Sequence, residues 1–96
     1  TPVFSDCNDD MCLDYEHTIK LITENTAAIC HVHIGGLISN SAIKLAELCD
    51  EKDIHFVEDA AQAHGTIYDD KKLNILGESI IPLILFQIQQ LQNLLF

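Results

Sequence analysis

The sequence predicts an α/β fold with a partial parallel sheet, because short apolar runs alternate with helical patterns. The runs cover residues 3–6, 27–34 and 54–58, and an amphipathic segment separates each pair. Two successive strand–helix–strand units within about sixty residues are typical of a parallel sheet with right-handed crossovers. We therefore expect a three-layer α/β arrangement in which the carboxyl ends of the strands share one edge.

The first expected strand leads through a polar loop into a short amphipathic helix. Asp14 can cap this helix, because an aspartate oxygen accepts hydrogen bonds from the free amides of the first turn. Tyr15, Ile19 and Ile22 then share one face of the helix. Polar residues end the helix before the second strand, residues 27–34.

The second helix has the stronger pattern. Ser39 or Asn40 can cap it. Its apolar residues recur at positions i, i+3, i+4 and i+7: Ala42, Leu45, Ala46 and Cys49. Lys52 lies in the last turn, where a positive charge interacts favourably with the helix dipole. The third strand, residues 54–58, follows at once, so this helix is expected to connect two parallel strands.

The chain changes in composition after residue 66. Ile67 and Tyr68, followed by two Asp and two Lys, indicate a small surface turn or hairpin. Residues 80–96 contain eleven large apolar residues and no charge, and their helical spacing predicts a helix from about Pro82. Four Gln interrupt this stretch well short of the roughly 20 apolar residues of a membrane span. We divide the chain into a partial α/β domain, residues 1–79, and an apolar tail, residues 80–96.

The charge balance disfavours two classes of partner. Five Lys, no Arg and fifteen acidic residues give a formal net charge of -10, whereas nucleic acids and anionic membranes require clustered cations. The four cysteines have no CxxC spacing, and no secretory signal opens the sequence, so we expect reduced thiols and a cytoplasmic protein. A disulfide between Cys7 and Cys12 is the alternative. Because the sequence starts at Thr1 rather than Met, we expect it to be part of a longer chain.

The most informative segment follows the third expected strand: Val57-Glu58-Asp59-Ala60-Ala61-Gln62-Ala63-His64-Gly65. It places a carboxylate at the carboxyl end of a parallel strand, where open α/β sheets bind their ligands. The residues after Asp59 are small enough to leave space for a planar ring. An Asp beside a pyridine nitrogen keeps that nitrogen protonated, so the segment suits a cofactor whose ring acts as an electron sink.

Residues 2–77 resemble the middle of the large domain of the DegT/DnrJ/EryC1/StrS family. The match is carried by Pro2-Val3-Phe4-Ser5-Asp6, Thr26-Ala27-Ala28-Ile29, Val32-His33-Ile34-Gly35-Gly36, Leu45-Ala46-Glu47-Leu48-Cys49 and, above all, the segment from Val57 to Gly65, with Tyr68 and Leu76-Gly77 after it. The resemblance implies a fold-type-I transferase with pyridoxal phosphate as cofactor. It also implies a homodimer that transfers an amino group, typically from glutamate, to a nucleotide-linked keto-sugar.

The resemblance further implies roles for individual residues. Asp59 would pair with the pyridine nitrogen of pyridoxal phosphate, Gln62 would hydrogen-bond near the ring hydroxyl, and Ala61 would pack against the ring face. His33 and His64 would lie close by in supporting roles. Structural roles are the alternatives, because an Asp can cap the turn after a strand, a loop Gln is usually solvated, and His64 is as often a structural donor.

The chain departs from the family pattern in two segments. The family's Schiff-base lysine lies beyond the position of Gly77, and no Lys follows Lys72 here. The family's phosphate-binding residues lie before the position of Thr1. Some sugar dehydratases of the family use His in place of the lysine, but the tail contains no His. We hypothesise a frameshift between about Gly77 and Ile81, because the codons for residues 81–88, read one nucleotide out of register, can spell a Ser-Phe-containing string close to the family's.

Other patterns could form ligand sites. His31 and His33 alternate on one strand face near Cys30, but Cys30 points to the opposite face and a third ligand is missing, so core or edge histidines are expected. His31 replaces a Pro common in the family. Gly35-Gly36 lacks the context of a phosphate loop, which favours a tight turn. The acidic residues between positions 6 and 14 lack the Gly and terminal Glu of an EF-hand, which favours a solvated loop.

We therefore predict a fragment of a pyridoxal-phosphate-dependent sugar aminotransferase that is inactive alone because it lacks the lysine. The alternative is a non-catalytic interaction module whose apolar tail, residues 80–96, docks on a partner or self-associates.

Overall fold

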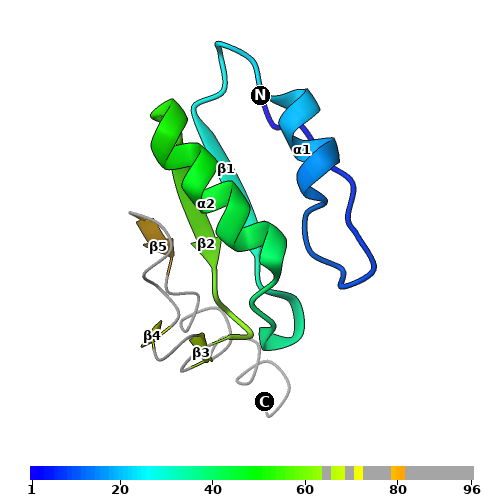
Figure 1. Cartoon of the computed structure of the whole chain (residues 1–96), viewed down its shortest axis with the longest axis vertical. Helices are drawn as coiled ribbons and strands as arrows, with labels where there is room; N and C mark the ends of the chain where they lie inside the picture. The colour runs from blue at the N-terminus through cyan, green and yellow to red at the C-terminus, as the bar shows by residue number, and fades with distance from the viewer. Residues whose placement is uncertain (64–65, 69–70, 73–78, 82–96) are drawn as a thin grey trace, which may run out of the picture.

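The centre of the structure is a parallel sheet with helices on one face (Figure 1). The computed structural model describes residues 1–63, 66–68, 71–72 and 79–81. The strands lie in the order β1 (Ala28–Val32), β2 (His55–Asp59) and β5 (Ser79–Ile81), and both neighbouring pairs are parallel. The α/β class and the parallel strands predicted from the sequence are therefore confirmed.

The amino-terminal segment differs from the prediction. Residues 3–6 form no strand, and Val3 and Phe4 are 69% and 88% exposed. Within the described residues, this segment instead has an isolated antiparallel bridge between Cys7 and Leu13. The prediction of a first strand was wrong because an apolar run forms a parallel strand only where the sheet buries it. The third strand of the sheet is β5, which pairs with β2 from the other side.

The first helix, α1 (Tyr15–Leu21), begins where the sequence predicted. The Asp14 carboxylate caps it by accepting a hydrogen bond from the His17 amide at 2.7 Å. The partly buried residues Leu13, Tyr15 and Ile22 pack against the hydrophobic core. α1 therefore lies beside α2 and widens the helical layer on that face of the sheet (Figure 1).

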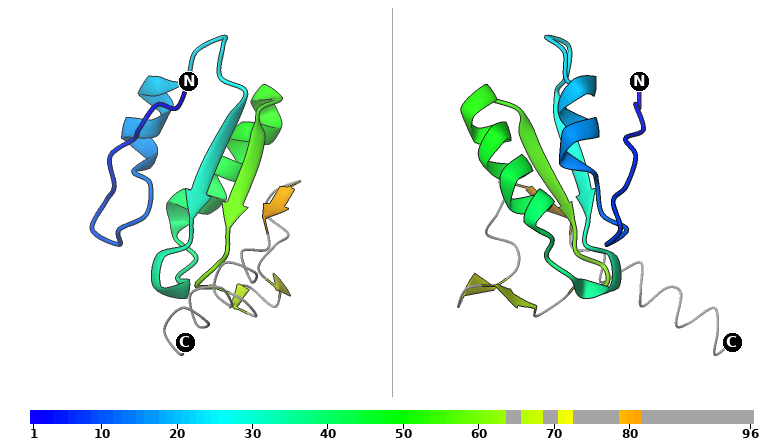
Figure 2. Two further views of the ribbon diagram at one scale, coloured as in Figure 1. Left: turned by 180° about the vertical axis from the view of Figure 1, so that it is seen from behind. Right: turned by 45° about the vertical axis from the view of Figure 1, so that its right-hand side comes forward.

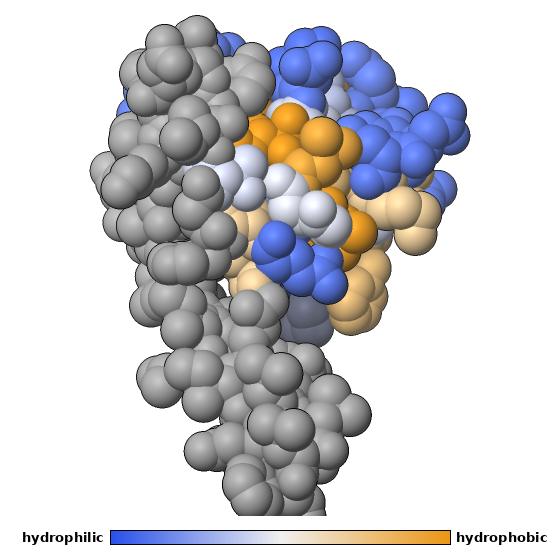
Figure 3. All heavy atoms as spheres, turned by 90° about the horizontal axis from the view of Figure 1, so that it is seen from below, coloured by the Kyte–Doolittle hydropathy of each residue, from blue (hydrophilic) through white to orange (hydrophobic). Residues whose placement is uncertain are grey.

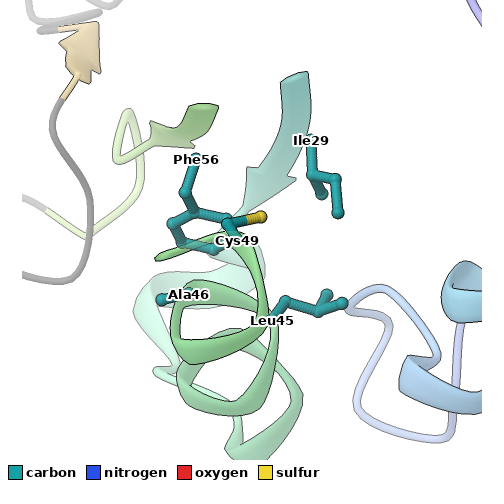
Figure 4. Close-up of a cluster of buried hydrophobic side chains, with 5 residues drawn as sticks. All are labelled: Ile29, Leu45, Ala46, Cys49 and Phe56. Carbon is teal, nitrogen blue, oxygen red and sulfur yellow. The ribbon is translucent and has the colours of Figure 1, made fainter. Parts of the chain in front are cut away.

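The second helix, α2 (Asn40–Lys52), connects β1 to β2 and carries the core. The Ser39 hydroxyl caps it, accepting from the Ala42 amide at 3.1 Å. All four apolar residues of the predicted stripe are buried: Ala42, Leu45, Ala46 and Cys49. Figure 4 shows three of them packed with Ile29 of β1 and Phe56 of β2. The helical pattern of this segment therefore predicted both the helix and its buried face.

Alternation along β1 and β2 gives the sheet two different faces. The residues buried toward α2 are Ile29 and His31 from β1 and Phe56 and Glu58 from β2. On the other face, the residues are exposed or half-buried: Ala28, Cys30, Val32, His55, Val57 and Asp59. No helix of the described residues covers this second face, which is turned to the viewer in the left view of Figure 2. We call it the open face.

The remaining described elements are short. β3 (Ile67–Tyr68) and β4 (Lys71–Lys72) pair antiparallel, which confirms the predicted hairpin. The helix expected from Pro82, and most of the apolar tail proposed to dock on a partner, lie outside the described residues. Among the helices that the structure describes, none is long and apolar enough to cross a membrane.

Candidate functional site

The loops that follow β1 and β2 meet at the carboxyl edge of the sheet (Figure 1). The first loop contains the short 3-10 helix η1 (Ile34–Gly36), and the second begins with the turn over residues 60–63. The hydrogen bonds that join them run from the His33 amide to the Asp59 carbonyl (3.1 Å), from the Gly35 amide to Gln62 Oε1 (2.8 Å) and from Thr66 Oγ1 to the Gly36 carbonyl (3.3 Å). Figure 3 views the molecule from this end, where apolar and hydrophilic residues lie side by side.

Asp59 is the last residue of β2, and it belongs to the half-buried set on the open face. Its Oδ1 accepts a hydrogen bond from the Ala61 amide at 3.0 Å, which fixes the side chain over the start of the turn. Among the described residues, this is the one hydrogen bond that the structure gives the carboxylate. Asp59 therefore caps the turn, as the structural alternative proposed, and also has acceptor capacity left at the ligand-binding edge of the sheet.

The turn after Asp59 is built from small residues. Ala60 and Ala61 are half-buried, and Ala63 is 1% exposed. The Ala63 amide donates to the Ala60 carbonyl at 2.9 Å, which closes the turn. Since neither Ala60 nor Ala61 has atoms beyond Cβ, these two residues of the turn place no large side chain beside the Asp59 carboxylate.

Gln62 is exposed, but its side chain is not simply solvated. Its Oε1 accepts from the Gly35 amide, so the side chain spans the gap between the two loops. The amide group of Gln62 can still donate, because only its oxygen is used in this contact. The structure thus gives Gln62, three residues after Asp59, a bracing role that the sequence pattern did not show.

The glycine pair forms the tight turn expected from the sequence. Gly35 and Gly36 have φ angles of 64° and 79°, a region that residues with a side chain rarely adopt. A Cβ on Gly36 would lie 2.7 Å from the Gln62 carbonyl oxygen. Gly36 is therefore required both by its own backbone conformation and by the close approach of the second loop.

The His33 side chain lies with Glu58, on the opposite side of β2 from the Asp59 carboxylate. Its Nε2 is 2.9 Å from Oε1 of Glu58, and both side chains are fully buried. Sequence reasoning placed His33 in a supporting role but did not single out Glu58. The available signal was a carboxylate at an inward position of a strand, which requires a buried partner. His64 lies outside the described residues.

His31 is buried beside this pair. Its ring centroid is 5.0 Å from that of His33, in an edge-on arrangement, and 6.0 Å from that of Phe56. Neither ring nitrogen has a hydrogen-bond partner within the described part of the chain. The pKa of His31 is lowered from 6.5 to about 4, mainly by burial and to a smaller extent by the neighbouring His33. His31 is therefore a neutral core residue near neutral pH, in agreement with the structural interpretation of the His31–His33 pattern.

The other patterns have structural explanations. Cys30 is exposed on the opposite face from His31, as alternation predicted, and the described residues contain no group of three or more His, Cys, Asp or Glu able to hold a metal. In the acidic loop, Asp6 and Asp10 accept from the amides of Cys7 and Cys12, each at 2.9 Å. These carboxylates thus stabilise their own loop. Cys7 and Cys12 are free thiols, so the structure lacks the alternative disulfide.

Comparison with known proteins finds relatives that match most of this chain. The model of the DegT/DnrJ/EryC1/StrS aminotransferase family matches residues 1–81. The L-glutamine:2-deoxy-scyllo-inosose aminotransferase of Streptomyces kanamyceticus is 36% identical over 77 residues, which cover 79% of this chain and 18% of that protein. The GDP-perosamine synthase of Vibrio cholerae is 32% identical over 78 residues, 80% of this chain and 21% of that protein.

Solved structures agree with the sequence matches. Helicobacter pylori PseC, an aminotransferase involved in the biosynthesis of pseudoaminic acid, has a TM-score of 0.69 at 33% identity, covering 76% of this chain and 19% of its own. DesV of S. venezuelae, solved in complex with a ketimine intermediate, has a TM-score of 0.71 at 39% identity, and the match covers 82% of this chain and 21% of DesV. The chain thus spans about a fifth of the length of these relatives.

Proposed function

The chain belongs to the DegT/DnrJ/EryC1/StrS aminotransferase family, and on this premise we propose that it is the segment that holds the cofactor ring in such an enzyme. The family uses pyridoxal phosphate. The observation that carries the proposal is the position of Asp59 at the carboxyl end of β2, half-buried on the open face and with one hydrogen bond among the described residues. The 57–65 segment, on which the family resemblance chiefly rests, begins within this strand.

The residues around Asp59 fit a protonated heteroaromatic ring. The carboxylate keeps acceptor capacity beyond its bond to the Ala61 amide, so it can hold a proton on a ring nitrogen. Ala60 and Ala61 leave room for a flat group, and the amide of Gln62 can donate to a ring substituent. When bound, pyridoxal phosphate supplies an electron-poor ring that takes up electrons from the carbon whose bond is broken. Asp59 would keep the ring in that state.

The activity of the whole enzyme is a wider proposal. We propose that the parent protein is a cytoplasmic homodimer that moves an amino group from a donor such as glutamate to a nucleotide-linked keto-sugar. The names of its relatives support this class, since they include a GDP-perosamine synthase and a dTDP-3-amino-3,4,6-trideoxy-alpha-D-glucose transaminase. To this chain we assign cofactor positioning and not turnover. Its last lysine, Lys72, lies in β4, before the segment in which the family carries the Schiff-base lysine.

The proposal is tested by titrating the 96-residue chain with pyridoxamine phosphate, which has no aldehyde to react with surface lysines. Cofactor fluorescence measures binding, and amide spectra show where it occurs. We expect saturable binding that shifts the amide signals of residues 59–63. Asp59→Ala should weaken binding about tenfold or more, because hydrogen bonds to charged groups contribute on the order of 1.5–3 kcal/mol.

Asp50→Ala is the matched control, since it removes an exposed carboxylate from α2 and the same unit of charge. It should leave the affinity unchanged within about twofold. Equal affinity in wild type and Asp59→Ala, or signal changes confined to residues far from the turn, would refute the proposed site.

A further inference from the structure

We infer that Glu58 is a positioning residue, which pairs with His33 to set the strand register that turns Asp59 toward the open face. The inference deepens the proposed function and rests on the assignment of Asp59 as the contact for the cofactor. Glu58 itself does not touch that site, because it points to the opposite side of β2, toward α2.

Hydrophobicity alone does not strongly determine which residues of β2 face α2. The strand reads His-Phe-Val-Glu-Asp, so two apolar residues are followed by two carboxylates. In the observed register, Phe56 and Glu58 face α2, and Val57 and Asp59 face away. Because side chains alternate along a strand, a slip of one residue would exchange the two sets. Val57 would then replace Phe56 in the core, and Asp59 would be buried.

The His33–Glu58 pair distinguishes the two arrangements. The observed register pairs His31 with Glu58 and Val32 with Asp59, and the His33 amide continues the ladder to the Asp59 carbonyl. This brings His33 Nε2 within 2.9 Å of the Glu58 carboxylate, 25 residues later in the chain, at full burial. A carboxylate is costly to bury unless it is hydrogen-bonded. A strand slipped by one residue would bring Asp59, whose side chain is one methylene shorter, under α2 in place of Glu58, and would remove Asp59 from the open face.

The environment of His33 also indicates which ring nitrogen carries the proton in the contact with Glu58. His33 Nδ1 is buried and has no hydrogen-bond partner within the described part of the chain. A proton on Nδ1 would therefore have no acceptor, whereas a proton on Nε2 is donated to Glu58. The adjacent His31 ring meets His33 edge-on and makes no hydrogen bond to it. The neutral ring of His33 is accordingly the Nε2–H tautomer, with Glu58 as acceptor.

The test uses the Ala61 amide as a reporter that needs no cofactor. This amide donates to Asp59 Oδ1, so its signal follows the titration of the Asp59 carboxyl only while that contact exists. Glu58→Met removes the acceptor and keeps the volume. Glu58→Gln keeps an oxygen that can accept from His33 Nε2. Glu51→Met makes the same change at an exposed position of α2 and serves as the matched control.

We expect Glu58→Met to abolish the pH-dependent change of the Ala61 amide signal, which we call the Ala61 response. The same substitution should weaken pyridoxamine phosphate binding about tenfold or more. Glu58→Gln and Glu51→Met should keep the response and stay within about twofold of wild-type affinity. A folded Glu58→Met chain with an unchanged Ala61 response would overturn the inference. Should Glu58→Met fail to fold, the nitrogen spectrum of the wild-type imidazole decides, because a His33 ring with a proton on Nδ1 and none on Nε2 could not donate to Glu58 and overturns the inference equally. Failure of wild type to bind the cofactor would refute the proposed function, while the Ala61 response would still test the role of Glu58.

Discussion

Replacing Gly36 with alanine is expected to destabilise the chain much more than the same change at Gly35. Both residues have positive φ, at 79° and 64°, and a side chain in that region costs about 1–2 kcal/mol at either position. The difference lies in the surroundings. A Cβ at Gly36 would lie 2.7 Å from the carbonyl oxygen of Gln62, whereas a Cβ at Gly35 would have no atom within 4 Å.

The overlap at Gly36 is with backbone, so it cannot be relieved by rotating a side chain. The two loops must move apart, which strains the hydrogen bond from the Gly35 amide to Gln62 Oε1 and the one from Thr66 to the Gly36 carbonyl. Losing one such bond costs about 1 kcal/mol. We therefore expect about 1–2 kcal/mol for Gly35→Ala and about 2–4 kcal/mol for Gly36→Ala. The effect of alanine on the unfolded chain is common to both and cancels in the comparison.

Urea unfolding followed by circular dichroism measures both free energies, and thermal unfolding provides a second measurement. For a domain of this size, the expected difference corresponds to a melting temperature about 5–10 °C lower for Gly36→Ala than for Gly35→Ala. Equal destabilisation by the two substitutions would refute the close approach of the loops, and with it the arrangement of the turn beside Asp59.

Other substitutions test the core, the cap and the buried imidazole. Leu45→Ala should lower the free energy of unfolding by about 2–5 kcal/mol, because Leu45 is fully buried, while Leu37→Ala, at 50% exposure, should change it by about 0.5 kcal/mol or less in urea unfolding. Ser39→Ala should cost about 1 kcal/mol by removing the α2 cap, and no loss of α2 stability by circular dichroism would contradict this. The folded chain keeps His31 neutral down to about pH 4, whereas the unfolded chain protonates it below about pH 6.5, so stability should fall as the pH drops through this window. His31→Leu should remove on the order of 3 kcal/mol of that fall in the free energy of unfolding. If the free energy of unfolding depended on pH in the same way in wild type and His31→Leu, the burial of His31 would be contradicted.

Local sequence patterns predicted the elements whose stability is local. The spacing of Leu45 and Cys49 and the cap at Ser39 gave α2 and its buried face, and Asp14 gave the start of α1. The prediction of a strand at residues 3–6 was wrong because the stability of a strand is not local. A short apolar run becomes a strand only if another strand lies beside it, and that depends on distant residues.

The position of Asp59 at the end of a strand was predictable, but the contacts around it were not. A carboxylate followed by small residues at a strand end indicated the ligand edge, and Asp59 lies there. The bond from Gly35 to Gln62 and the pairing of His33 with Glu58 join residues 27 and 25 positions apart. Such contacts follow from the register of β1 and β2, which no short sequence window contains.

The central place of β2 in the sheet has a consequence for the dynamics of the chain. With β1 on one side and β5 on the other, the backbone around Asp59 cannot open without separating two ladders at once. Hydrogen exchange should therefore be slowest at the amides of β2 and faster in the exposed loop at Gln62. The Asp59 carboxylate would therefore stay fixed on the strand that opens most slowly. The adjoining turn would remain free to change its conformation around a bound ligand.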